Sequence, residues 1–301
     1  MNRRTLLKAL PLGGAMVLAG GLWRSAGVRR EIVTPPIDDE RPEPPSPAAL
    51  DPPRDEGSAP GDRPAPDPRK IEDFDRTYDD DVVLPPERLA IVAATVAHLE
   101  RAQRVIGHGH FSLLSFDRLL RFGRNYASIG RFSRRELDFL EEIFFADAAA
   151  YGFFGDKVTP ELTAVVPRRR VEKLPGTGNY LLRGESLDTY RQIRRDLGAG
   201  IVLTSGIRGV VKQSLLFLAK VLETGGNLSQ ASRSLAPPGY SYHAVGDFDV
   251  GKVGLGADNF TEAFAETDEY KRMIDLGYVE IRYTESNLFG VRHEPWHVKI
   301  R

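Results

Sequence analysis

Two histidines and several acidic residues in the C-terminal part of the chain have the types and spacing of a metal centre. The first histidine, His243, is followed by Asp247 and Asp249, and the second, His297, is preceded by Glu294. Imidazole and carboxylate groups together suit zinc, and a nearby glutamate suits the activation of water. These residues indicate a zinc centre of the hydrolytic type, with the choice of carboxylate ligand left open.

The absence of cysteine narrows the chemistry further. Any metal must be held by His, Asp or Glu, and disulfides and a cysteine nucleophile are excluded. The chain has 301 residues, of which 41% are hydrophobic, enough for one sizeable core once the N-terminal third is set aside. Its formal net charge of −1 gives no reason to expect a nucleic-acid partner.

The first 30 residues have the pattern of an export signal. Arg3, Arg4 and Lys8 flank the start of an apolar run from Ala9 to Trp23. The paired arginines resemble a twin-arginine signal, and the run is shorter than the roughly 20 residues of a membrane helix. We therefore expect an exported protein of the periplasm or cell envelope. Retention of this segment as a membrane anchor is the alternative to its cleavage.

Residues 31–85 differ sharply in composition from the rest of the chain. The stretch from Pro35 to Pro68 contains 12 of the 21 prolines, and almost no aromatic or β-branched residues accompany them. Such a composition buries too little apolar surface to offset the entropy of ordering the chain. The sequence predicts a disordered tether over residues 31–85.

A helical subdomain is predicted for residues 86–165, before the candidate metal centre. Apolar residues recur at helical spacing over 87–105, and further helices are expected over 113–122 and from Ser133 onward. Ser133 and Glu136 form an S-x-x-E capping box. The role of this subdomain is not legible from the sequence.

Residues 166–301 alternate between strand and helix patterns and are predicted to form the domain that carries the metal. Helices are expected over 184–197 and 209–223, and strands over 201–204, 278–283 and 296–300. The overall prediction is an α+β fold, with a small antiparallel sheet and flanking helices around the zinc site. In the last strand, His297 lies on the face opposite Trp296 and should point into a cleft or solvent.

Two other motifs carry less weight. His108-Gly109-His110 follows a predicted helix and is interpreted as a turn with solvated imidazoles, with a second pair of metal ligands as the less frequent alternative. The run Arg168-Arg169-Arg170 is interpreted as a solvated or partner-facing loop, with a basic patch for anionic wall polymers as the alternative.

Three motifs in a fixed order support a family resemblance. They are Ser-Gly-x-Arg (205–208) with Gln213 five residues later, Ser-x-His-x-x-Gly (241–246) with a following Asp, and Glu-x-Trp-His (294–297). Over about residues 201–301 the chain resembles the VanY-like zinc D-alanyl-D-alanine carboxypeptidase family, which also includes L,D-carboxypeptidases and wall endopeptidases. Each motif alone is weak, and their order makes the resemblance specific.

The resemblance implies a role for seven residues. It implies zinc held by His243, Asp249 and His297, Glu294 as general base for zinc-activated water, Arg208 binding the peptide and stabilising the oxyanion, and Ser241 and Gln213 lining the substrate pocket. The sequence departs from the family at one point, because Asp249 follows His243 by six residues and the family aspartate by seven. Either the loop is one residue shorter, or Asp247 is the ligand.

The function implied by the resemblance is hydrolysis of the terminal D-Ala-D-Ala bond of peptidoglycan stem peptides. The alternatives are an L,D-carboxypeptidase or endopeptidase on the same polymer, and a non-catalytic wall-binding module on the same fold. The sequence contains Glu294, which a binding module would not need. The sequence does not decide which peptide bond is cleaved.

Overall fold

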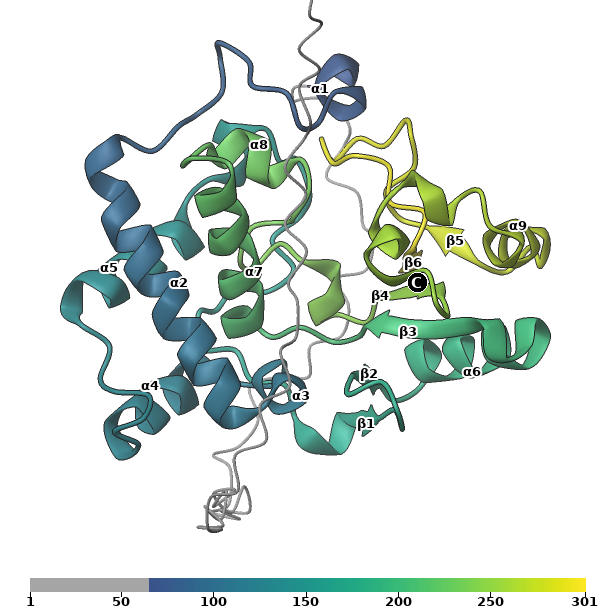
Figure 1. Ribbon diagram of the computed structural model, residues 1–301, viewed down its shortest axis with the longest axis horizontal. Coiled ribbons are helices and arrows are strands. Elements are labelled where there is room, and N and C mark those ends of the chain that lie inside the picture. The colour runs from purple at the N-terminus through teal and green to yellow at the C-terminus, as the bar shows by residue number, and fades with distance from the viewer. Residues whose placement is uncertain (1–64) are drawn as a thin grey trace, which may run out of the picture. The chain divides into compact units, whose positions relative to one another are not determined.

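The computed structural model describes residues 65–301, so the predicted export signal and the predicted tether up to residue 64 lie outside the described residues. The described part combines helices with two small antiparallel sheets, as Figure 1 shows, and the predicted α+β class is confirmed. All of it belongs to a single unit, Pro44–Arg301. None of the helices in residues 65–301 is long and apolar enough to cross a membrane.

The predicted helices of the N-terminal half are present with small shifts. They are α2 (Pro86–Ile106), the short α3 (His108–Phe111), α4 (Phe116–Asn125) and α5 (Arg134–Phe145). Helix α4 begins three residues later than predicted because the Ser115 hydroxyl caps it, accepting a hydrogen bond from the Arg118 amide. The capping box of Ser133 and Glu136 forms as predicted at the start of α5.

Helix α7 (Val210–Glu223) joins the helical half to the rest of the molecule. Its Phe217 and Leu218 are fully buried in the core that also contains Leu99 of α2 and Phe139 of α5. The sequence pattern predicted a helix that is apolar on nearly every side, and this is how α7 is buried. The predicted domain boundary after residue 165 remains a prediction, and one core contains residues from both sides of it.

A four-stranded antiparallel sheet occupies the C-terminal half, in the order β3-β4-β6-β5. Helices α6 (Glu185–Leu197) and α9 (Asp268–Asp275) contribute Ile193 and Met273 to the core beneath it, and Figure 1 shows both helices beside the sheet. The strands are β3 (Ile201–Ser205), β4 (Phe248–Lys252), β5 (Glu280–Ile281) and β6 (His297–Lys299), and a separate hairpin pairs β1 (Val171–Lys173) with β2 (Tyr180–Leu182). The strand predicted over 278–283 is thus shorter than expected.

The register of this sheet brings distant motifs together. Asp249 on β4 lies opposite His297 on β6, and Ser205 on β3 lies opposite Asp249 across an irregular pairing. Trp296 and Val298 are buried in the core under the sheet, so His297 faces the other side, as its alternation predicted. Three segments that are far apart in the chain therefore meet on one face.

Residues 65–85, which we call the strap, correct the tether prediction. They include α1 (Pro68–Glu72) and a single bridge between Val83 and Asn227, next to α8 (Leu228–Ser232). The Asp81 carboxylate is fully buried in an ion pair with Arg233. The prediction of a disordered tether was wrong for residues 65–85, because specific polar contacts order this segment despite its poor apolar content.

The two minor motifs are both at least partly exposed. His108 is exposed and His110 half-buried, both within α3. The arginines of the basic run form a 3-10 turn, Arg168–Arg170, with none of them buried, so its interpretation as a surface segment is confirmed. A role as a patch for anionic wall polymers stays a proposal.

Candidate metal centre

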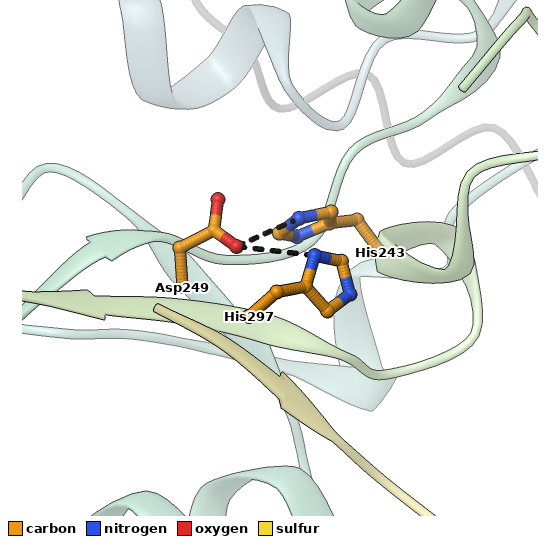
Figure 2. Close-up of side chains that lie close together, drawn as sticks. All are labelled: His243, Asp249 and His297. Carbon is orange, nitrogen blue, oxygen red and sulfur yellow. Dashed lines mark ion pairs between the residues drawn. The ribbon is translucent and has the colours of Figure 1, made fainter. Parts of the chain in front are cut away.

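His243, Asp249 and His297 converge in the structure (Figure 2). Each offers one donor atom, and the three atoms lie within 4.8 Å of one another. Asp249 Oδ1 is 3.2 Å from His243 Nε2 and 3.3 Å from His297 Nδ1. All three side chains are buried. Within residues 65–301, these three side chains form the one group of His, Asp and Glu residues whose geometry could hold a metal ion.

The loop between His243 and Asp249 owes its shape to a glycine. His243 lies in a 3-10 turn, Tyr242–Ala244, and the Tyr242 carbonyl accepts hydrogen bonds from the amides of Gly246 and Asp247. Gly246 has φ = 134°, and a Cβ there would lie 2.8 Å from the Ser186 hydroxyl, which donates to the Gly246 carbonyl. Only glycine adopts this backbone without strain. The shortened loop therefore turns tightly enough for Asp249 to reach the histidines.

The remaining nitrogen of each ring is held by a specific partner. His243 Nδ1 lies 2.9 Å from the Gly206 carbonyl, which can only accept, so Nδ1 carries the proton and Nε2 presents a lone pair. His297 Nε2 donates to Asp247 Oδ2 at 2.9 Å, so Nδ1 faces the group. Such partners fix the tautomer and orientation of metal-binding histidines.

These contacts separate the two candidate aspartates. Asp249 lies inside the group, whereas Asp247 lies behind His297 and is held by Arg282, whose Nη2 donates to Asp247 Oδ1 at 3.0 Å. Of the two alternatives that the sequence left open, the geometry thus favours the shorter loop with Asp249 as the ligand. Asp247 takes the position of a residue that orients a ligand.

The charges around the group move the histidine pKa values in opposite directions. Burial, assisted by the charge of Arg208, lowers the pKa of His243 to about 4. Burial also opposes the charged form of His297, but hydrogen bonds to Asp247 and Glu294 outweigh it and raise its pKa to about 9. At neutral pH His243 is ready to donate its lone pair, whereas His297 must release a proton when it binds a cation.

Two of the atoms that could bind a metal make no hydrogen bond in the described part of the chain. Within residues 65–301, His243 Nε2 and Asp249 Oδ1 are buried and neither makes a hydrogen bond. An unsatisfied buried polar atom costs about 1–3 kcal/mol, and native proteins contain few of them. Two nitrogen donors and one carboxylate oxygen match the ligand set of catalytic zinc, which uses three protein ligands. The residues present therefore fit zinc.

Glu294 lies beside this group on the segment that leads into β6. Its Oε2 is 3.5 Å from His297 Nδ1, and its amide donates to the Tyr283 carbonyl. The side chain is largely buried but lines the same cleft as the three candidate ligands. It is placed to exchange a proton with a molecule bound next to them.

Arg208 has a partner that the sequence did not predict. Its Nη2 donates to Asp249 Oδ2 at 2.6 Å, and its Nε donates to the Ser205 hydroxyl at 2.9 Å. Burial raises the pKa of Asp249, but the charges of His243 and then of Arg208 outweigh it and keep this pKa well below its usual range. The contact orients the ligand carboxylate, and Arg208 also lines the cleft.

A cleft of about 530 Å³ opens over the group. Ser241 and Gln213, the two predicted pocket residues, both line it. Gln213 Nε2 donates to the Ala236 carbonyl at 2.5 Å, and its buried Oε1 has no partner within residues 65–301. All seven residues singled out from the sequence therefore meet at one cleft.

Some cleft residues were missed by sequence reasoning. His108 was interpreted as part of a solvated turn, yet it lines the cleft, as do Lys212 and Arg292. Lys212 lies in the first turn of α7, four residues after Arg208, and this closeness in sequence was the one usable signal. The pattern gave no sign that α3 would reach this cleft.

Comparison with known proteins agrees with this geometry. Residues 185–300 match the family model of VanY, described as D-alanyl-D-alanine carboxypeptidase. This match confirms the family resemblance inferred from the sequence for this part of the chain, which is less than half of its length. The enzyme class predicted from the sequence agrees with the description of this family.

Two solved structures are similar to part of the chain. One is a variant of the vancomycin-resistance D,D-pentapeptidase VanY from a VanB-type cassette in complex with Zn(II), and the other is VanYB in complex with D-alanine-D-alanine. Each is 23% identical, with a TM-score of 0.33 over 44% of this chain, and the match covers 81% and 80% of the two relatives respectively. No curated protein matches.

Proposed function

We propose that this protein is a zinc-dependent peptidoglycan peptidase, a D-alanyl-D-alanine carboxypeptidase. One observation carries the proposal: a buried His-Asp-His group with two unsatisfied donor atoms lies beside Glu294, in a cleft of a carboxypeptidase-family domain. The description of the matching family supports the substrate class.

His243, Asp249 and His297 would hold the zinc ion. When bound, zinc lowers the pKa of a water molecule toward about 7 and polarises a carbonyl group. His243 and His297 are fixed for this by the Gly206 carbonyl and by Asp247.

Glu294 supplies the proton transfer. Its Oε2 accepts a proton from the water that attacks the scissile carbonyl, and it then delivers this proton to the amide nitrogen as the C–N bond breaks. The products are the shortened peptide and free D-alanine. Arg208 uses Nε and Nη2 on Ser205 and Asp249, which leaves Nη1 for an oxygen of the substrate. Gln213 Oε1 can accept an N–H group from the peptide.

Purified full-length protein, loaded with zinc and incubated with defined stem peptides, tests this proposal by mass spectrometry. Loss of a single terminal D-alanine supports the carboxypeptidase. Loss of another residue or an internal cut indicates the L,D-carboxypeptidase or endopeptidase alternative, and binding without cleavage indicates a wall-binding module.

The decisive variant is Glu294→Gln. It removes the base and no ligand, so it should keep stoichiometric zinc and lose turnover by about 10²-fold or more. Glu262→Gln is the matched control, because Glu262 is an exposed glutamate paired with His293 and lies outside the cleft. Full activity of Glu294→Gln would refute the assigned mechanism.

We also propose that the protein is exported, on the sequence of residues 1–30 alone. Replacing Arg3 and Arg4 by lysine keeps the charge and removes the pair that a twin-arginine receptor reads. The substituted protein should accumulate in the cytoplasm, as measured by fractionation. Unchanged export would indicate the general secretory route or a plain anchor.

A further inference from the structure

We propose that Lys212 binds a carboxylate of the peptide substrate, at a subsite next to the metal centre. Lys212 lies in the first turn of α7, four residues after Arg208, and lines the cleft. The inference rests on the proposed function and adds a specificity-determining residue to it.

The ion pairs around the cleft single out this lysine. Arg208 is paired with Asp249, Lys220 with Glu223, and Arg292 lies 4.0 Å from Glu294. Within residues 65–301, Lys212 has no carboxylate within 4.0 Å, and its Nζ donates to the Oε1 of Gln103, a neutral amide, at 2.7 Å. Its positive charge is therefore available to a ligand in the cleft.

Burial makes this free charge costly. Lys212 is half-buried, and burial together with the charge of Arg208 lowers its pKa to about 8. A carboxylate bound there would compensate the charge and form a charge-assisted hydrogen bond, which is stronger than the bond to a neutral amide. An anionic group should therefore bind more tightly at this position than an uncharged group of the same shape.

Gln103 acts as a positioning residue for Lys212. It is buried on α2, outside the cleft, and its side-chain oxygen accepts the hydrogen bond from Lys212. An uncharged amide holds the ammonium group in place without neutralising it, which a carboxylate would do. This contact gives the helical half a part in substrate recognition, which the sequence did not reveal.

Two carboxylates of a peptide substrate have the required chemistry. One is the carboxylate at the C-terminus, and the other is a carboxylate on a residue upstream of the scissile bond. Binding is measured by calorimetry with the full-length zinc-loaded Glu294→Gln protein, to prevent turnover. Three peptides are compared: one with both carboxylates, one with the C-terminus amidated, and one with the upstream group as a carboxamide.

Lys212→Gln should raise the Kd of the peptide with both carboxylates by about 10-fold, the effect of one charge-assisted hydrogen bond. Lys212→Gln should not change the Kd of the peptide that lacks the carboxylate bound by Lys212. Comparison of the two modified peptides therefore shows whether Lys212 binds the C-terminal or the upstream carboxylate. Lys252→Gln is the matched control, since Lys252 lies outside the cleft and is paired with Glu269, and it should leave the Kd unchanged. Equal weakening for all three peptides, or no weakening, would overturn the inference.

Gln103→Glu provides a second test that keeps the lysine. A glutamate at this position would pair with Lys212, so the Kd of the peptide with both carboxylates should rise. The Kd of the modified peptide that does not respond to Lys212→Gln should stay the same. A purely structural role for Gln103 would change both or neither. Because binding is measured without turnover, failure of the parent protein to cleave would refute the proposed function and leave this result standing.

Discussion

The buried ion cluster of the strap and the buried cluster of the metal centre contain similar groups in opposite states. In the strap, both oxygens of Asp81 accept hydrogen bonds, from Arg233, Asn227 and the Tyr78 amide, and Arg233 also donates to backbone carbonyls. In the metal centre, Asp249 Oδ1 accepts no hydrogen bond from any of the described residues. Both carboxylates are equally buried.

The difference between these clusters separates structural from functional polar groups. A fully satisfied buried pair holds two segments together and has no capacity for a ligand. In the other cluster, the surrounding residues hold buried lone-pair atoms in place without hydrogen bonds. This arrangement lowers the stability of the fold, and a bound ion would offset the loss. The two clusters have the same burial and contain the same kinds of charged group. They differ in whether each carboxylate oxygen accepts a hydrogen bond.

The largest expected effect comes from removing the carboxylate of Asp249, whose Oδ1 accepts no hydrogen bond within residues 65–301. Asp249→Ala takes away one of the three proposed ligands and removes the partner of Arg208, so stoichiometric zinc and measurable turnover should both be lost. Zinc content by elemental analysis and peptide hydrolysis measure this. An Asp249→Ala protein that binds zinc as the parent does would show that another carboxylate is the ligand.

Breaking the satisfied cluster should affect stability without affecting the metal. Asp81→Asn leaves Arg233 buried without its counter-charge and should lower the free energy of unfolding by about 3 kcal/mol at pH 7. Chemical denaturation measures this loss, and zinc content should be unchanged. Loss of zinc in this variant would contradict the separation of the two clusters.

The pH dependence of the same variant sharpens the comparison. Burial opposes ionisation of Asp81, but hydrogen bonds from Arg233 and Asn227 outweigh it and hold its pKa well below its usual range. The contribution of the Asp81 charge to the free energy of unfolding is therefore complete above the pKa of about 4 in the unfolded chain. This contribution is lost as the pH falls toward the pKa of Asp81 in the folded protein. The stability difference between the parent and Asp81→Asn should shrink below about pH 4, and a constant difference would contradict this.

A smaller effect is expected at the partner of His297. Asp247→Asn keeps the shape and removes the charge that orients the imidazole, so zinc affinity should fall by about 10- to 100-fold while the metal remains bound at saturating zinc. Competition with a chromophoric chelator measures the affinity. If Asp247→Asn loses zinc as completely as Asp249→Ala, then Asp247 is itself a ligand.

The sequence determined the local elements and the residue types of the site. Periodicity and capping predicted α2, α5, α6 and α7 closely, because helix formation depends on neighbours a few residues apart. The alternation around His297 predicted its face, and the order of three motifs predicted the family. Composition misjudged residues 65–85, because the contacts that order Asp81 lie more than a hundred residues away in the sequence.

Only the tertiary structure decided how these parts meet. The pairing of β4 with β6 placed Asp249 inside the metal group and Asp247 behind His297, a choice that spacing left open because both aspartates lie close to the histidine in sequence. The packing of α2 against α7 brought Gln103 to Lys212. Such contacts depend on sheet register and helix packing, which arise from the whole core and are encoded in no single stretch of the chain.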